Sequence, residues 1–457
     1  MTRSSTTDYD CLIIGGGIAG LTCGIACLRG GLSCAVISAG MNALHFSSGS
    51  IDLLGHFPGN TIVHSPLETL PEFIAHNPAH PYARCGADHV REALSFFQKE
   101  LAGAGLPLND NNGRNHFHVT ALGTTKPTFL SQPSVFSPAI KTAFEEKADI
   151  AIINVRGFRD FHPELAAANL KKHPLFATTR ITRGQIELPE EDLPGRVHEM
   201  RSVDIARILD TAADLGPIAR RLRKACGRAD CAGMPAFLGI DHHDRVLTEL
   251  RRQSGVLLYE VPTLPPSILG MRLDNALKSL FAALGGVFIA GESVSRGRIS
   301  GGAVDHIETV NQGDTLRAET YVLSTGSFFS KGLSSRFQKI EEPVFDLQPD
   351  PDTADAEFAA ARFFAPESHL FLSAGVVTDE TLRPCTRDGR VVDNLYCAGA
   401  VLAGYNPIAE GSGGGVAIAT GYRAAREIID RLGATGQNQG RNTAGTGSTS
   451  PGPTDTA

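Results

Sequence analysis

The sequence predicts an α/β protein with a Rossmann-like nucleotide-binding domain, made of a parallel sheet and a β-meander, and an inserted α/β domain. Two observations predict this class. Residues 10–28 form a short apolar strand that runs into Gly15, Gly17 and Gly20 and then into a helix of small residues. From about residue 148 to 265 strand-like and helix-like segments alternate before the first pattern resumes.

Each glycine of the turn has a physical role. Gly15 permits the tight turn, Gly17 lets the backbone approach phosphates, and Gly20 lets the helix lie close to the strand. The helix N-terminus holds the negative charge of the phosphates. After the second strand, residues 34–37, the chain has Ser38 where a dinucleotide fold normally has an acid for a ribose hydroxyl. The phosphate half of the signature is therefore present and the ribose half is absent.

Composition limits the function classes. A length of 457 residues suits two or three domains, and a net charge of −7 argues against nucleic-acid binding. The nine cysteines form no CxxC pair, which favours reduced cytoplasmic thiols and no metal or iron–sulfur site. Asp8 and Asp10 stand where a signal peptide needs positive charge, and no segment reaches the roughly 18 apolar residues of a membrane span. We therefore expect no membrane anchor in this chain.

The order of patterns predicts a discontinuous nucleotide-binding domain. The inserted domain interrupts it, a capping segment follows, and the Gly-, Ser- and Thr-rich end is expected to be disordered. The predicted segments are 8–65, 266–330 and 391–433 for the nucleotide-binding domain, 66–265 for the inserted domain, 331–390 for a second or capping domain, and 434–457 for the tail.

Two further segments are typical of flavoproteins. Residues 321–326 resemble the strand ending in Thr-Gly that runs beside a flavin, and residues 394–400 resemble a segment of the succinate dehydrogenase and fumarate reductase type. That segment usually ends in an acid that holds the ribityl chain, and here it ends in an alanine. The glycine run behind it starts a helix whose free N–H groups would face the flavin ring. The candidate residues are Gly326, Gly399, Ala400, Gly413, Gly414 and Gly415.

The reactive residues are expected at the carboxyl edge of the sheet, where ligands of such folds bind. His45 follows the second strand, together with Ser48, Gly49 and Ser50. Some flavoprotein relatives attach their flavin to a histidine in this neighbourhood. Arg383 is a candidate anion ligand. The alternatives are a loop histidine that only makes structural hydrogen bonds and an arginine held in a salt bridge.

Five longer strings carry a more specific resemblance. Together they resemble the B subunits of anaerobic, quinone-linked glycerol-3-phosphate dehydrogenase, within the two-domain, fumarate-reductase-like flavoproteins. The resemblance covers residues 8 to about 432. The strings are LHFSSGSIDLL (44–54), PTLPPSILGMRL (262–273), LSTGSFFSKGL (323–333), GVVTDETLRP (375–384) and NPIAEGSGGGVAIATGY (406–422).

This resemblance implies a complex on the inner face of the cell membrane that oxidises sn-glycerol 3-phosphate to dihydroxyacetone phosphate. The A subunit would carry FAD, the B subunit would carry FMN, and an iron–sulfur C subunit would dock both to the membrane and pass electrons to menaquinone. His45 and Arg383 are then the nearest candidates for the base and the phosphate ligand. The alternative is an electron-relay or scaffold protein without substrate chemistry, which the missing acids at Ser38 and Ala400 favour.

The identity of the flavin follows from Ser38. FAD presents an adenosine ribose to this position, and losing a carboxylate hydrogen bond costs roughly 1.5–3 kcal/mol. FMN has no adenosine and needs no acid, so the sequence predicts FMN. The glycine turn, however, usually holds a pyrophosphate, which FMN lacks. FAD therefore stays the alternative, and a chain without flavin is the third possibility.

Overall fold

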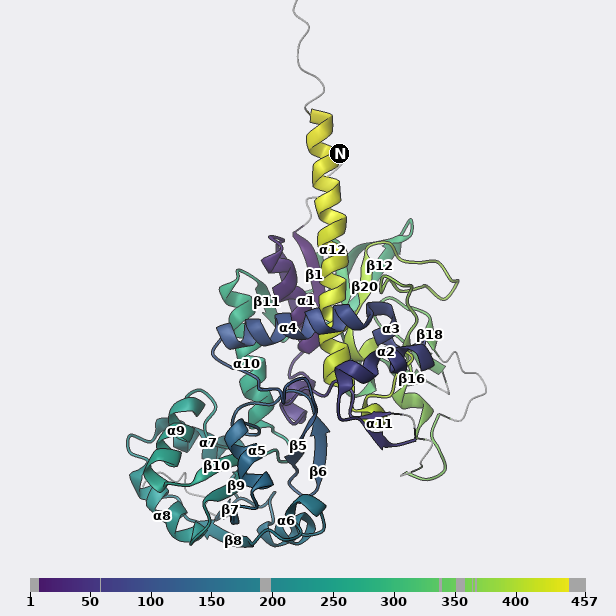
Figure 1. Ribbon diagram of the computed structural model, residues 1–457. Helices are drawn as coiled ribbons and strands as arrows, with labels where there is room; N and C mark the ends of the chain where they lie inside the picture. The colour runs from purple at the N-terminus through teal and green to yellow at the C-terminus, as the bar shows by residue number, and fades with distance from the viewer. Residues whose placement is uncertain are drawn as a thin grey trace, which may run out of the picture.

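A five-stranded parallel sheet in the order β11-β2-β1-β15-β20 forms the centre of the larger unit (Figure 1). The computed structural model describes residues 8–57, 59–189, 199–336, 339–350, 358–363, 365 and 368–443, with side chains up to residue 433. Four strands of this sheet are almost completely buried, as expected for a parallel sheet covered on both faces, whereas the edge strand β11 is partly exposed. The strands are β11 (Val287–Ala290), β2 (Cys34–Ser38), β1 (Tyr9–Ile14), β15 (Ala318–Leu323) and β20 (Leu395–Cys397).

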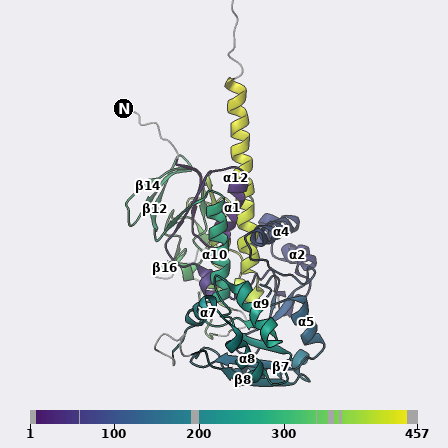
Figure 2. The same cartoon turned by 90° about the vertical axis from the view of Figure 1, so that its left-hand side faces the viewer.

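The two faces of this sheet bury alternate residues of each strand, because side chains alternate along a strand. Ile13 and Val36 face one core with the helices, whereas Leu12 and Ile37 face the other core with the meander. Figure 2 shows the meander and the helices on opposite sides. The helical layer contains α1 (Ile18–Arg29), α4 (Ala87–Gly103), α10 (Ile268–Ala283) and α12 (Gly413–Thr443), and the meander contains β12 (Val294–Ser300), β13 (Ala303–Thr309) and β14 (Thr315–Leu316).

The inserted unit has its own parallel sheet in the order β10-β9-β7-β8 and its own core. Figure 1 shows it below the main sheet, connected through α10. The α/β class with an inserted α/β unit is confirmed. Its strands are β7 (Ile150–Val155), β8 (Ile181–Ile186), β9 (Cys231–Pro235) and β10 (Leu257–Val261), and its helices are α5 (Pro138–Glu145), α6 (Pro163–Leu170), α7 (Ser202–Thr211), α8 (Gly216–Cys226) and α9 (His243–Ser254).

The inserted unit begins later in the chain than residue 66, the predicted boundary, when it is defined by its packing. Helices α2 (Pro66–His76), α3 (Pro81–Cys85) and α4 contribute buried residues such as Phe73 and Leu94 to the core that contains α1 and α12. Residues up to about 108 therefore pack with the nucleotide-binding sheet. The core of the inserted unit begins at Val119. The boundary was predicted too early because an amphipathic sequence pattern shows that one face of a helix is buried, but not which sheet that face covers.

The remaining elements are short and connect these layers. Helix α12 runs on to Thr443, so the backbone stays helical over the first ten residues of the segment predicted as a disordered tail, and residues 444–457 lie outside the described residues. None of the described helices is long and apolar enough to cross a membrane. The short elements are β3 (His56–Phe57), β4 (Thr61–Ile62), β5 (His116–Val119), β6 (Thr125–Thr128), β16 (Ser334–Arg336), β17 (Lys339–Glu341), β18 (Pro349–Asp350), β19 (Gly375–Val376) and α11 (Pro407–Glu410), with single 3-10 turns at Ala43–Phe46, Pro174–Phe176, Phe328–Ser330, Leu370–Leu372 and Gly399–Val401.

One buried carboxyl group under the meander predicts a pH dependence of stability. Glu342 accepts hydrogen bonds of 2.8 Å from the backbone N–H groups of Val344 and Phe345. Burial nevertheless raises the pKa of Glu342 to about 7. Because the folded pKa is raised, this group stabilises the protein most below pH about 4.5, and the contribution, of the order of 3 kcal/mol, is lost as pH rises towards 7.

We expect this slope in denaturant unfolding of the wild-type protein between pH 5 and 8. It should be absent in Glu342→Gln and present in Glu341→Gln, where the neighbouring carboxyl group is partly exposed. An equal slope in both variants would assign the pH dependence to another group.

Candidate functional site

The glycine turn between β1 and α1 leaves an open space at the N-terminus of the helix. Gly15 has a φ angle of +118°, and a Cβ atom there would collide with the carbonyl group of Ser324. A Cβ atom on Gly20 would collide with the carbonyl oxygen of Gly15, so α1 rests directly on the turn. Gly17, by contrast, has no atom within 4 Å of the position of a Cβ. Such a space before a helix N-terminus is suited to a phosphate group.

The N-terminus of α12 lies beside the loop that follows β2. The backbone N–H of Gly415 donates to the carbonyl oxygen of Asp52 at 2.8 Å. A Cβ on Gly415 would collide with the hydroxyl group of Tyr82, which explains the small residue there. Within the described part of the chain, the N–H groups of Gly413 and Gly414 have no acceptor, as expected at a helix start. These two groups are free to bind a ligand.

The segments after β15 and β20 complete the carboxyl edge of the sheet. Gly326 and Gly399 have φ angles of +82° and +78°, and the N–H of Gly399 donates to Thr420 Oγ1 at 2.9 Å. Thr325 Oγ1 is buried and has no hydrogen-bond partner among the described residues. A buried hydroxyl group without a partner is costly, so a polar ligand would satisfy it. Ala400 is exposed and offers no carboxylate.

Ser38 is buried at the end of β2, next to the glycine turn. Its hydroxyl group donates to the carbonyl oxygen of Gly40 at 3.2 Å. A Cβ atom on Gly16 would lie 3.0 Å from the Cβ of Ser38. The structure provides no carboxylate at this position, in agreement with the sequence.

His45 forms a hydrogen bond with Asp274, a residue that no sequence motif marks. His45 Nε2 lies 2.9 Å from Asp274 Oδ2, and Lys278 Nζ lies 2.7 Å from the same oxygen. Asn42 joins this group to the turn, because its Nδ2 donates to Asp274 Oδ1 at 2.7 Å and to the carbonyl oxygen of Gly16 at 2.8 Å. Asp274 is buried, and the side chain of His45 is partly exposed. A buried carboxylate that orients a reachable imidazole is the arrangement of a general base.

The other residues of the 44–54 loop meet the inserted unit. Gly49 has a φ angle of +67°, and Ser48 is half-buried in the same turn. Ser50 Oγ lies 3.0 Å from Ser131 Oγ, which lies 2.8 Å from His116 Nε2. Burial lowers the pKa of His116 to about 3, so this histidine is neutral at physiological pH. The three side chains form a polar chain from the loop into the interior.

Charged and polar residues of the β5–β6 hairpin approach the same loop. Lys126 Nζ contacts Asp52 Oδ2, and Thr128 Oγ1 donates to Asp52 Oδ1 at 3.1 Å. His118 Nδ1 lies 3.3 Å from Thr128 Oγ1. These residues were not predicted from the sequence, because no motif marks the hairpin. They fix Asp52, whose carbonyl oxygen holds the first turn of α12.

A second group that was not predicted supports α12 from the other side. Buried His80 accepts the N–H of Tyr82 at Nδ1, which leaves Nε2 to donate to Glu410 Oε2 at 3.1 Å. Ser412 Oγ also donates to this oxygen, at 2.7 Å. Tyr82 donates its hydroxyl to the carbonyl oxygen of Leu53 at 2.7 Å. The glycine-rich start of α12 is therefore held by side chains on both flanks.

Arg383 is not brought together with His45. Its guanidinium group contacts Asp379 at 2.9 Å and lies 3.8 Å from Asp393. The geometry corresponds to the alternative that an arginine is held in salt bridges. That Arg383 binds the phosphate group stays a prediction.

Comparisons with known proteins agree on a flavin-binding family. A family model described as an FAD binding domain matches residues 10–416. The chain is 39% identical over 449 residues to the B subunit of an anaerobic glycerol-3-phosphate dehydrogenase from Aliivibrio fischeri, covering 95% of this chain and 98% of the relative. It is 38% identical over 430 residues to the protein of the same description from Actinobacillus pleuropneumoniae, covering 92% and 99%.

Two solved structures match the chain at low sequence identity. A 3-ketosteroid delta1-dehydrogenase from Sterolibacterium denitrificans matches at 12% identity and a TM-score of 0.43, over 93% of this chain and all of the other. A quinol fumarate reductase chain from E. coli matches at 8% identity and a TM-score of 0.42, over 95% and 74%.

The family match agrees with the prediction that the chain binds a flavin. It does not agree with the prediction that this flavin is FMN, because the family is described as an FAD binding domain.

Proposed function

This chain belongs to the family of anaerobic glycerol-3-phosphate dehydrogenase B subunits, and from this premise we propose that it acts in the oxidation of sn-glycerol 3-phosphate to dihydroxyacetone phosphate. The observation that carries the proposal is the 39% identity over nearly the full length of both chains. In this function the chain works with two partners, an FAD-carrying A subunit and an iron–sulfur C subunit that docks the complex at the membrane. The electrons then reach menaquinone through these partners.

The residues at the carboxyl edge fit a flavin nucleotide. The open space at Gly17 suits phosphate, the hydroxyl of Thr325 lacks a partner among the described residues, and the N–H groups of Gly413 and Gly414 are free. A bound flavin supplies the two-electron acceptor that the oxidation of an alcohol needs. The positive end of the α12 dipole favours negative charge at this place.

We propose FAD as the cofactor, because the family match describes an FAD binding domain and this type of glycine turn usually holds a pyrophosphate. The second candidate is FMN, which the absence of an acid at Ser38 favours. Mass spectrometry of the small molecule released by denaturation separates them. Release of FAD would support the proposal. Release of FMN would support the second candidate, whose binding needs no ribose contact at Ser38. A chain that folds with neither flavin would contradict a flavin function and favour a scaffold.

The alternative is an electron relay whose substrate is oxidised elsewhere in the complex. The His45–Asp274 pair favours substrate chemistry on this chain, because a base is needed for the substrate hydroxyl group. Anaerobic addition of glycerol 3-phosphate to the purified, flavin-loaded chain distinguishes the two functions. Loss of the visible flavin absorbance without a partner supports substrate oxidation here. A flavin that stays oxidised until the FAD-carrying partner is added supports the relay.

Gly17→Ala is expected to weaken flavin binding by about ten- to a hundredfold without destabilising the fold. Nothing lies within 4 Å of the new methyl group, and the φ angle of Gly17 is −87°, which alanine adopts readily. The methyl group would occupy the space reserved for the phosphate. Gly103→Ala is the matched control, because its Cβ also meets no atom and it lies far along α4. Flavin retention measured by equilibrium dialysis and thermal unfolding test the prediction, and equal retention in both variants would contradict it.

A further inference from the structure

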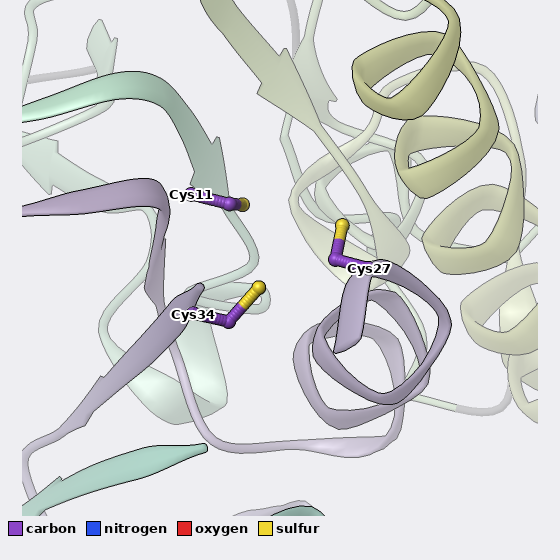
Figure 3. A group of neighbouring side chains, drawn as sticks. All are labelled: Cys11, Cys27 and Cys34. Carbon is purple, nitrogen blue, oxygen red and sulfur yellow. The ribbon is translucent and has the colours of Figure 1, made fainter. Parts of the chain in front are cut away.

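Three cysteines meet in the interior between β1, α1 and β2. The Sγ atoms of Cys11, Cys27 and Cys34 all lie within 4.8 Å of one another, and all three residues are buried. Figure 3 shows their side chains directed towards a common space. Cys11 and Cys34 are register partners on adjacent strands, and Cys27 comes from the last turn of α1.

The spacing of these sulfur atoms is close to that of a metal–thiolate site. A metal–sulfur distance of about 2.3 Å places three sulfurs around one ion roughly 4 Å apart. Three atoms that already lie within 4.8 Å of one another need to move only by a fraction of an ångström to reach this geometry. Sulfur ligands select soft ions rather than magnesium or calcium.

We propose that the three-cysteine cluster, Cys11, Cys27 and Cys34, binds one thiophilic d10 metal ion, Zn²⁺ or Cu⁺. No metal was predicted from the sequence, because the three residues do not form a CxxC pair. These cysteines are separated in the sequence, but the starts of two strands lie beside the end of the helix between them, and this brings the cysteines together. Four of the nine cysteines lie between residues 11 and 34, whereas the neighbouring core positions carry aliphatic residues.

A bound ion would offset part of the charge of its ligands inside the apolar core. Each cysteine ligand loses its proton when it binds the metal, and the protons are released to solvent. Three thiolates leave a net charge of −1 with Zn²⁺ and of −2 with Cu⁺.

The cluster lies close to the surface at the amino edge of the sheet. Asp10 and Ser33 directly precede Cys11 and Cys34, and Ser33 donates its N–H and hydroxyl to Asp10 Oδ2, each at 2.8 Å. Opening this solvent-accessible pair gives an ion access to the thiols. The flavin site lies at the opposite, carboxyl edge. The proposal therefore does not depend on the proposed function.

Metal titration of the full-length, reduced and chelator-treated chain tests the proposal. Zn²⁺ and Cu⁺ are added separately in competition with a chromophoric chelator, and Co²⁺ serves as a spectroscopic substitute for Zn²⁺. We expect one equivalent per chain, a thiolate-to-cobalt charge-transfer band, and a higher melting temperature with the preferred ion. Cys27→Ala and Cys34→Ala should each weaken binding at least tenfold and lose the cobalt band.

Cys226→Ala is the matched control, because Cys226 is equally buried but lies in the inserted unit. It should bind the metal as the wild-type chain does. Circular dichroism confirms that each variant is folded before titration. Unchanged binding in the two cluster variants would overturn the proposal, as would a folded wild-type chain that takes up neither ion. A mass loss of two hydrogens within the peptides of the cluster would overturn it in favour of a disulfide.

Discussion

Replacing Arg272 with methionine is expected to destabilise the protein by about 3–5 kcal/mol. Arg272 on α10 and Glu260 on β10 form a fully buried pair, with NH1 and NH2 of the arginine 2.6 Å and 2.9 Å from the two carboxylate oxygens. Methionine fills a similar volume, so the loss comes from the Glu260 carboxyl group, which must either stay charged without its partner or take up a proton at neutral pH. Urea unfolding of the wild type and the variant at pH 7 measures the difference.

The double variant Arg272→Met with Glu260→Leu separates the ion pair from packing. Removing both charges avoids the unpaired carboxylate, so we expect most of the lost stability to return. Part of the loss should remain, because two donors to Glu260 lose their acceptor in the double variant. They are the hydroxyl of Ser134 at 2.7 Å and the N–H of Leu238 at 2.8 Å. A double variant no more stable than the single one would mean that Arg272 acts through its volume.

The pH dependence of this pair has a definite sign. Burial acts to raise the pKa of Glu260, but the charges of Arg272 and His243 and the hydrogen bonds from Arg272 and the Leu238 N–H together lower the pKa to about 2. Because the folded pKa is depressed, the pair stabilises the protein fully above pH about 4.5, and this contribution is lost as pH falls towards 2. In Arg272→Met the buried carboxyl group takes up a proton instead. The variant should therefore be closest to the wild type in acid and furthest from it at neutral pH.

The glycine turn could be predicted from the sequence because its requirements are local. Gly15 needs a positive φ angle, and Gly20 needs the absence of a side chain against the turn a few residues away. Both constraints act within one strand–turn–helix unit, so the spacing of the glycines contains them. The absence of an acid at Ser38 could be recognised for the same reason. Local backbone constraints were therefore sufficient to locate the glycine turn and the end of β2 at Ser38.

The partners of the site could not be predicted, because tertiary packing selects them. His45 and Asp274 are 229 residues apart, and only the contact between α10 and the loop after β2 joins them. The three cysteines of the cluster likewise meet only when two strands and a helix pack together. For Arg383 a signal was present in the chain, since Asp379 precedes it by four residues and became its salt-bridge partner. An acid within the same short segment is a nearer partner for an arginine than a distant anion.

His45→Gln is expected to lower the rate of flavin reduction by glycerol 3-phosphate by about a factor of 10²–10⁴, the usual contribution of a general base. If Nε2–H donates to Asp274, Nδ1 of the imidazole remains free to accept the proton of the substrate hydroxyl group. Glutamine keeps a polar group near Asp274 but cannot take up a proton. Anaerobic stopped-flow absorbance of the loaded protein measures the rate. The flavin content and melting temperature should stay close to those of the wild type, because His45 is partly exposed.

Two further variants distinguish a base from a structural histidine. Asp274→Asn should reduce the rate less than His45→Gln, because Asp274 acts by orienting the imidazole, and it should shift the pH profile of reduction. His306→Gln is the matched control, because His306 also pairs with an aspartate, Asp305 at 2.6 Å, but lies on β13 of the meander. It should leave the rate unchanged. A His45→Gln variant that leaves the rate unchanged while the flavin stays bound would mean that the proton acceptor lies elsewhere. In that case the His45–Asp274 pair would no longer argue against the electron-relay alternative.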